Sequence, residues 1–230
     1  MIKNALELIK SKLVVSCQAP VDSPLHDPQI IAAMAVACVQ RGAAGVRIDT
    51  PAHIKAVRER LPGVPIIGLW KRKMTGSSVY ITPRFEDGAA IAAAGADIIA
   101  MDATERKRPG GETVQEIIKR IHRELGKLVM ADVDNIKNGI AARAKGADLV
   151  GTTLYGYTTK TEHLSPPGYE LLTQLREQLD IPVICEGGIT TPQMAKVALE
   201  LGAYAVVVGG AITGIDLNAT AFQAVFMDRI

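Results

Sequence analysis

The sequence is poor in aromatic side chains and has no strong excess of either charge. Phe, Tyr and Trp together make up 4% of its 230 residues. The core must therefore be filled mainly by Ala, Val, Ile and Gly, which favour close packing of helices on strands. The formal net charge is only +2, so we expect neither a nucleic-acid nor a membrane surface. No apolar run reaches membrane-spanning length, and we expect no signal peptide.

Cysteine and histidine are also scarce, and neither has the spacing of a metal site. The cysteines are Cys17, Cys38 and Cys185, an odd number that we expect to be reduced thiols in a cytoplasmic protein. The four histidines share no metal-ligand spacing. We therefore predict no metal and no cofactor. His53 falls in a helical pattern, which predicts a position at the surface.

A repeat of about 50–55 residues runs through the chain, roughly twice the length of one βα unit. Each copy has a helix end, a Gly-Ala pair suited to a C-cap, and then a β-branched strand. The four copies are residues 41–49, 94–102, 145–152 and 201–209. The repeat therefore predicts strands at regular intervals, each preceded by a helix.

Four further strand candidates lie between these copies, at residues 13–16, 65–70, 128–131 and 182–185. Helical patterns follow the strands, for example at residues 28–40, 86–94, 113–125 and 191–201. Continuous apolar strands of this kind have both faces buried. We predict a single α/β domain over residues 1–230, a (β/α)8 TIM barrel with a short helix at residues 4–10 below it. A doubly wound open sheet is the alternative, but it lacks the fourfold repeat.

In such barrels the chemistry lies at the carboxyl ends of the strands. Polar residues stand at most of these ends: Gln18, Arg47, Asp49, Lys71, Asp102, Asp132, Thr153 and Glu186. Lys71 and Glu186 follow strands three and seven, which lie opposite each other in a barrel of eight. A lysine in a half-buried mouth has a lowered pKa, so this pair suits acid–base catalysis. A structural ion pair over the barrel mouth is the alternative.

The other strand-end residues suit substrate binding. Gln18 can donate and accept hydrogen bonds, and Thr153 ends the sixth strand. Asp102 and Asp132 are carboxylates able either to accept hydrogen bonds from sugar hydroxyls or to brace Lys71. Arg47 either binds substrate oxygens or is a buried brace paired with Asp49 or Asp132.

Two glycine pairs indicate a phosphate site. Gly187-Gly188 follows the seventh strand and precedes Thr191, an expected N-cap, while Gly209-Gly210 follows the eighth strand. Barrels frequently bind phosphate on backbone N–H groups at these two loops. The basic loop at residues 106–109 is expected to be solvated.

Specific segments carry a resemblance to a known family. Ser-Cys-Gln stands at residues 16–18, Gly-Val-Arg-Ile at 45–48, Val-Tyr-Ile-Thr-Pro at 79–83 and Cys-Glu-Gly at 185–187. The run Gly-Thr-Thr-Leu-x-Gly-Tyr-Thr occupies residues 151–158. With these segments in order along nearly the whole chain, the sequence resembles the N-acetylmannosamine-6-phosphate 2-epimerases.

The resemblance implies a (β/α)8 isomerase that interconverts N-acetylmannosamine 6-phosphate and N-acetylglucosamine 6-phosphate, in sialic acid catabolism, without metal or nicotinamide. It places the catalytic roles on Lys71 and Glu186, and substrate binding on Gln18, Arg47 and Asp132. Gly188 and Gly214 stand where members commonly carry larger residues, which leaves backbone N–H groups as the main phosphate anchor.

Two other functions stay open on the residues. A strand-end lysine can form a Schiff base, so a lyase of the aldolase type acting on a phosphosugar is one alternative. A phosphosugar-binding barrel without catalysis is another. In each case the partner is a phosphorylated amino sugar or a related small molecule. A homodimer is possible through the apolar helix face at residues 30–39.

Overall fold

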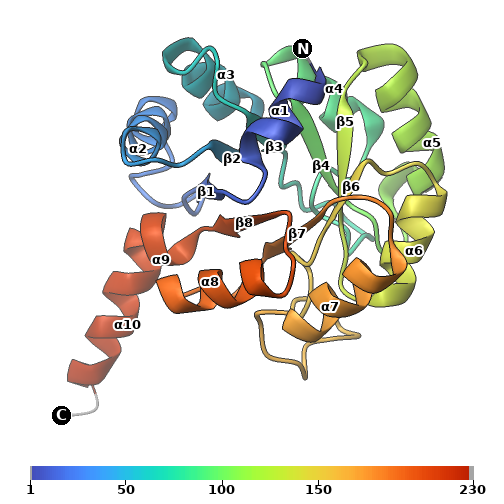
Figure 1. Cartoon of the computed structure of the whole chain (residues 1–230). Coiled ribbons are helices and arrows are strands. Elements are labelled where there is room, and N and C mark those ends of the chain that lie inside the picture. Colours follow the sequence, from blue (N-terminus) through green and yellow to red (C-terminus); the bar gives the residue numbers. More distant parts are fainter. Residues whose placement is uncertain (1, 228–230) are drawn as a thin grey trace.

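The computed structural model describes residues 2–227, with side chains from residue 5. Eight parallel strands follow one another around a closed barrel, and β1 pairs with β8 to complete it. The strands are β1 Leu13–Cys17, β2 Gly45–Asp49, β3 Ile66–Leu69, β4 Ile98–Asp102, β5 Leu128–Asp132, β6 Leu149–Gly151, β7 Val183–Glu186 and β8 Ala205–Val208. The predicted (β/α)8 barrel is confirmed (Figure 1).

Helices alternate with the strands and surround the barrel. They are α1 Ile2–Ile9, α2 Pro28–Gln40, α3 Pro51–Arg60, α4 Phe85–Ala93, α5 Val114–Arg120, α6 Ile136–Ala144, α7 Tyr169–Gln178, α8 Pro192–Glu200, α9 Gly210–Thr213 and α10 Ile215–Met227, with a 3-10 turn at Pro109–Gly111. The helix expected at residues 28–40 is confirmed. The one expected at residues 113–125 is divided, since a π-helical turn, Ile121–Leu125, continues α5.

The Gly-Ala pairs of the repeat end helices as expected. Gly42, Gly95, Gly146 and Gly202 all have positive φ, between 89° and 111°. An L side chain is disfavoured there, whereas glycine is not. The glycine reverses the chain so that the alanine can lead directly into the next strand. This local signal explains why the repeat in the sequence matches the repeat in the barrel.

The apolar core has two parts. The inner part fills the barrel with side chains such as Val14, Ile67, Met130 and Ile184, all fully or almost fully buried. The outer part lies between the strands and the surrounding helices. Ile9 of α1 joins the inner part, which confirms the expected helix at the bottom of the barrel. The barrel is therefore closed at that end by apolar packing, and the carboxyl ends of the strands lie at the other end, where barrel enzymes carry their active sites.

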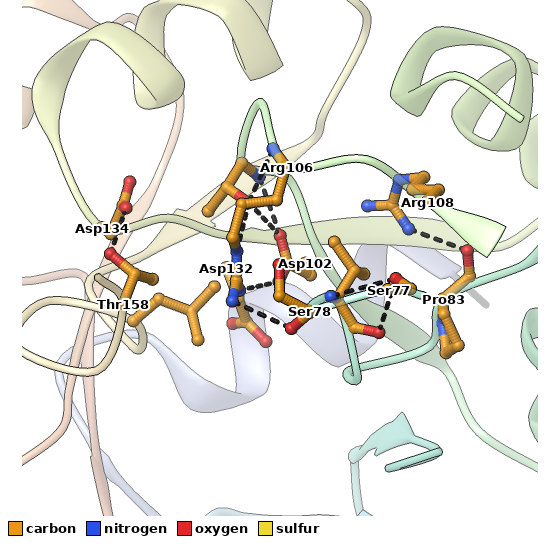
Figure 2. A network of polar contacts seen from close by, with 12 residues as sticks. Ser77, Ser78, Pro83, Asp102, Arg106, Arg108, Asp132, Asp134 and Thr158 are labelled. Atoms are coloured by element: carbon orange, nitrogen blue, oxygen red, sulfur yellow. Dashed lines mark hydrogen bonds and ion pairs between the residues drawn. The ribbon is translucent and has the colours of Figure 1, made fainter. Parts of the chain in front are cut away.

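Two expectations about surface residues are wrong. His53 is only 3% exposed, because α3 starts directly after β2 and its first turn packs against the barrel, where the ring contacts His26 edge-on. The basic loop at residues 106–109 is not simply solvated. Arg108 is 4% exposed and donates to the backbone oxygen of Pro83, so this loop folds over the one that follows β3 (Figure 2).

Candidate active site

Three charged side chains from different strands meet at the open end of the barrel. Arg47 of β2 donates from Nη2 to Asp132 Oδ2 at 2.7 Å, and its Nη1 lies 2.9 Å from Glu186 Oε2. All three side chains are largely buried. Of the two partners considered for Arg47, Asp132 is therefore the one that the fold selects. A buried ion group of this kind is costly to desolvate, which makes a functional role a better explanation than stability.

Lys71 follows β3 and stands at the same opening. Its backbone N–H donates to Asp49 Oδ1 at 2.9 Å, and its Nζ donates to Gln18 Oε1 at 2.6 Å. An isolated bridge to Ile81 turns the chain after β3 into a short hairpin that holds Lys71 in place. The structure therefore brings together the expected residues Gln18, which follows β1, and Lys71, which follows β3, with Asp49 of the intervening strand β2 beside Lys71.

The surroundings alter the protonation of the two residues predicted to be catalytic. Lys71 reaches solvent through the barrel mouth, yet protein atoms surround it, and the resulting loss of hydration lowers its pKa from the ordinary value. Burial, with the charge of Asp132, raises the pKa of Glu186 to about 7, while Arg47 opposes this. A protonated carboxylic acid at Glu186 is thus accessible near neutral pH, and the neutral amine of Lys71 is favoured relative to that of an exposed lysine. Proton transfer in two directions needs a group of each kind.

Two threonines fasten Glu186 from the neighbouring strand end. Thr152 Oγ1 donates to the backbone oxygen of Glu186 at 2.9 Å and accepts from its backbone N–H at 3.0 Å. Thr153 Oγ1 lies 2.7 Å from Asp132 Oδ1 and 3.1 Å from Glu186 Oε2. Thr153 was among the predicted site residues and lies within the site. The sequence signal for Thr152 was the same Gly-Thr-Thr run.

The two glycine pairs lie beside this group but differ in conformation. Gly187 and Gly188 have φ of 104° and 67°, values that suit glycine, whereas Gly209 and Gly210 have no positive φ. Gly210 begins the short helix α9. Thr191 caps α8 by accepting from a backbone N–H, with proline next, as expected. Both turns are therefore formed at the loops where phosphate binding was predicted, and phosphate binding itself stays a prediction.

Asp102 is not part of the site, contrary to expectation. It is fully buried and accepts from the backbone N–H and the hydroxyl of Thr104. Arg106 pairs with it and also donates to the backbone oxygen of Ser78 (Figure 2). Its carboxylate is consequently occupied by Thr104 and Arg106, and through Arg106 it connects the loop after β4 with the loop after β3. The sequence placed Asp102 and Asp132 equally at strand ends and did not reveal which of them meets Arg47.

Sequence reasoning overlooked two side chains near the site. Asp49 was considered only as a brace for Arg47, yet it accepts from Lys71. Tyr80 packs against the inner core on the hairpin after β3, and burial together with Asp132 raises its pKa. The sequence feature that could have revealed Tyr80 is the Val-Tyr-Ile-Thr-Pro segment that contains it.

Over residues 2–227 no group of three or more His, Cys, Asp or Glu is arranged to hold a metal ion. No helix in the same part of the chain is long and apolar enough to cross a membrane.

Comparison with known proteins agrees with this arrangement. Residues 31–227 match the family described as "Putative N-acetylmannosamine-6-phosphate epimerase". A relative from Synechococcus elongatus named "Putative N-acetylmannosamine-6-phosphate 2-epimerase" is 61% identical, covering 96% of this chain and 95% of the relative. One from Clostridium perfringens is 45% identical, covering 90% and 93%.

A solved structure is also similar. The N-acetylmannosamine-6-phosphate 2-epimerase from Clostridium perfringens superposes with a TM-score of 0.91 at 42% identity, covering 96% of this chain and 95% of that one. A thiamine phosphate pyrophosphorylase with a TM-score of 0.62 at 18% identity shares only the fold. The chain therefore belongs to the N-acetylmannosamine-6-phosphate epimerase family.

Proposed function

We propose that this protein interconverts N-acetylmannosamine 6-phosphate and N-acetylglucosamine 6-phosphate by moving a proton at C2. The observation that carries the proposal is the pairing of Lys71, whose pKa is lowered, with Glu186, whose pKa is raised to about 7, at one barrel mouth. The relatives at 45–61% identity are named for this substrate. The reaction belongs to amino sugar and sialic acid breakdown, and we place it in the cytoplasm.

In this proposal the open-chain sugar presents C2 next to its C1 aldehyde. Lys71 in its neutral form takes the C2 proton. The electron pair of the C2–H bond forms a double bond between C1 and C2, and the π pair of the C1 carbonyl moves onto its oxygen, which gives an enolate. Hydrogen-bond donors at the mouth stabilise the developing negative charge. Gln18, already bonded to Lys71 Nζ, positions the amine, and in this proposal it also contacts the sugar.

Glu186 then returns a proton to the opposite face of C2, which inverts the configuration. β3 and β7 are four strands apart in a barrel of eight, so Lys71 and Glu186 approach a central substrate from opposite sides. Arg47 and Thr153 contact Glu186 directly, Asp132 holds both of them, and in this proposal all three face the substrate. In the reverse direction the two residues exchange roles, as microscopic reversibility requires.

We place the phosphate on backbone N–H groups of Gly187-Gly188 and Gly209-Gly210. The two turns follow adjacent strands, β7 and β8, so they lie side by side on the rim. The positive φ of Gly187 and Gly188 supports a turn whose N–H groups face a ligand. Phosphate at these two loops would leave the sugar carbons directed towards Lys71 and Glu186.

Proton NMR of the full chain with N-acetylmannosamine 6-phosphate in deuterated water tests the proposal. We expect the gluco epimer to form with deuterium at C2, also in the presence of a chelator. Lys71→Ala should reduce the rate by about 100- to 10,000-fold, while Lys73→Ala, an exposed lysine in the same loop, should not. Intact substrate without exchange would contradict the proposal.

Kinetic and trapping measurements separate this proposal from the alternative functions. Glu186→Gln should lower kcat far more than it changes KM, because the loss concerns the transition state rather than binding. Cleavage into smaller carbonyl products, with a borohydride-trapped adduct on Lys71, would indicate a Schiff-base lyase instead. Tight binding with neither exchange nor cleavage would indicate a binding protein.

We also propose that the protein forms a homodimer through α10. Each of the helices α2 to α8 buries side chains, whereas no side chain of α10 is buried. Figure 1 shows α10 extending away from the barrel. Apolar residues of α2, α8 and α9 are exposed as well, including Ile30, Leu199 and Ile212. The α10 helix of a second copy would cover such a surface.

A further inference from the structure

The hydroxyl of Thr153 lies between two carboxylates of the site. Its Oγ1 is 2.7 Å from Asp132 Oδ1 and 3.1 Å from Glu186 Oε2. Gly151 leaves the room for this position. A Cβ on Gly151 would stand 3.0 Å from Thr153 Oγ1 and 3.3 Å from Asp132 Oδ1, tighter than ordinary contacts. The threonine side chain is therefore held where it bridges the ends of β5 and β7.

A hydroxyl has one hydrogen and can donate it to only one of these carboxylates. Asp132 is the nearer acceptor. When Asp132 and Glu186 are both ionised, the hydrogen goes to Asp132, and Glu186 Oε2 faces a lone pair of Thr153. Arg47 does not remove this conflict, because its Nη1 lies near both carboxylates, 3.2 Å from Asp132 Oδ1 and 2.9 Å from Glu186 Oε2.

A proton on Glu186 resolves the conflict. Its O–H donates to Thr153 Oγ1, and the Thr153 O–H donates to Asp132 Oδ1. Each of the three oxygens in this row of hydrogen bonds then has a suitable partner. We infer that Thr153 is a positioning residue that favours the protonated form of Glu186 and aims its proton, by accepting from Glu186 while donating to Asp132. The inference rests on the proposed function, in which Glu186 delivers a proton to the substrate.

The direction of the hydrogen bonds decides the sign of the effect. A Thr153 that accepts from Glu186 raises the pKa of that carboxyl, whereas a Thr153 that donates to it lowers the pKa. The other charged groups that face Glu186 are Arg47 from β2, Lys71 after β3 and Asp132 from β5. The thiol of Cys185 precedes it in β7, and Tyr80 faces Asp132 from the hairpin after β3. Replacing Thr153 leaves all of these in place.

Titration of the Glu186 carboxyl by carbon-13 NMR tests the inference in the full chain labelled at glutamate. The resonance is assigned as the one that Glu186→Gln removes. Thr153→Val should lower the titration midpoint by about one pH unit, which corresponds to one hydrogen bond. Thr153→Ser, which keeps the hydroxyl, should restore the midpoint. A rise in Thr153→Val, or no shift, would overturn the inference.

Thr152→Val is the matched control. Thr152 bonds the backbone of Glu186 but not its carboxylate, so its replacement should leave the midpoint in place. An equal shift of the Glu186 midpoint in both variants would show that any change in this loop alters the titration. That result would also overturn the inference.

The titration requires no turnover, so its result does not depend on whether the protein catalyses the proposed reaction. A lowered midpoint in a protein without epimerase activity would keep the role of Thr153 and reject the reaction. In the active enzyme, the limb of the kcat profile assigned to Glu186 should move to lower pH in Thr153→Val, with KM little changed.

Discussion

At the scale of single residues, Asp49 shows how a neighbour can tune the proposed base. Its Oδ1 accepts from the backbone N–H of Lys71. Burial lowers the pKa of Lys71, and the charge of Asp49 is the largest effect that raises it again. Asp49 therefore limits how far the amine moves towards neutrality. A lysine that must be neutral to act depends directly on this balance.

We expect Asp49→Asn to lower the pKa of Lys71 further, because the amide keeps an acceptor but loses the charge. The acid limb of kcat/KM, which follows deprotonation of the free enzyme's base, should move to lower pH. A pH series of initial rates measures the shift. Glu59→Gln, the same charge change at an exposed position of α3, is the control. An unmoved or raised limb would contradict this role.

Much of this chemistry could be predicted from residue type and position. Lys71, Glu186, Arg47 and Gln18 stand at strand ends, and parallel strands bring their carboxyl ends to one rim. The partner of Arg47 could not be predicted, because Asp49 and Asp132 are both strand-end carboxylates. The raised pKa of Glu186 was equally out of reach, since it arises from burial among residues far apart in the chain.

At the scale of elements, the last residues of the segment 151–158, Gly-Tyr-Thr, connect two loops of the barrel. Thr158, in the loop after β6, donates to Asp134 Oδ2 at 2.7 Å (Figure 2). Asp134 follows β5 and also accepts from Asn135 and Asn138. Both Thr158 and Asp134 are buried. The run therefore contributes Thr153 to the site and Thr158 to the junction that holds the site loops together.

We expect Thr158→Val to lower the free energy of unfolding by about 1–3 kcal/mol, because a buried carboxylate loses one donor. Urea denaturation measures the change. Thr159→Val, the exposed neighbour, should alter stability far less. Equal stability of the two variants would show that this bond contributes little to the junction.

At the scale of the whole molecule, α10 is the element that the barrel leaves uncovered. Phe222, Val225 and Phe226 are 75%, 59% and 62% exposed. Large apolar side chains exposed together on one helix mark an interaction surface. The helix face at residues 30–39, which the sequence had suggested, buries Ile31 and Ala35 within its own barrel. The homodimer is therefore proposed through α10, and of the face at residues 30–39 only exposed side chains such as Ile30 belong to the surface that α10 would cover.

We expect the double variant Phe222→Asp and Phe226→Asp to be monomeric and less stable to heat, because buried charges without partners oppose association. Light scattering coupled to size-exclusion chromatography over a range of concentrations measures the mass. Ile140→Asp on α6, also an exposed apolar residue, should leave the mass unchanged. A wild-type monomer at every concentration would reject the dimer.

The sequence by itself determined the eight βα units and the end of the barrel at which the candidate site residues meet. β-branched strands, Gly-Ala helix ends and strand-end polar residues are local signals, and a repeated local signal leaves few folds that satisfy it. Tertiary structure decided the rest. It determined that Arg47 pairs with Asp132, that Asp102 pairs with Arg106, and that Thr153 lies between two carboxylates. These outcomes depend on burial and on contacts between distant segments, which no local pattern encodes.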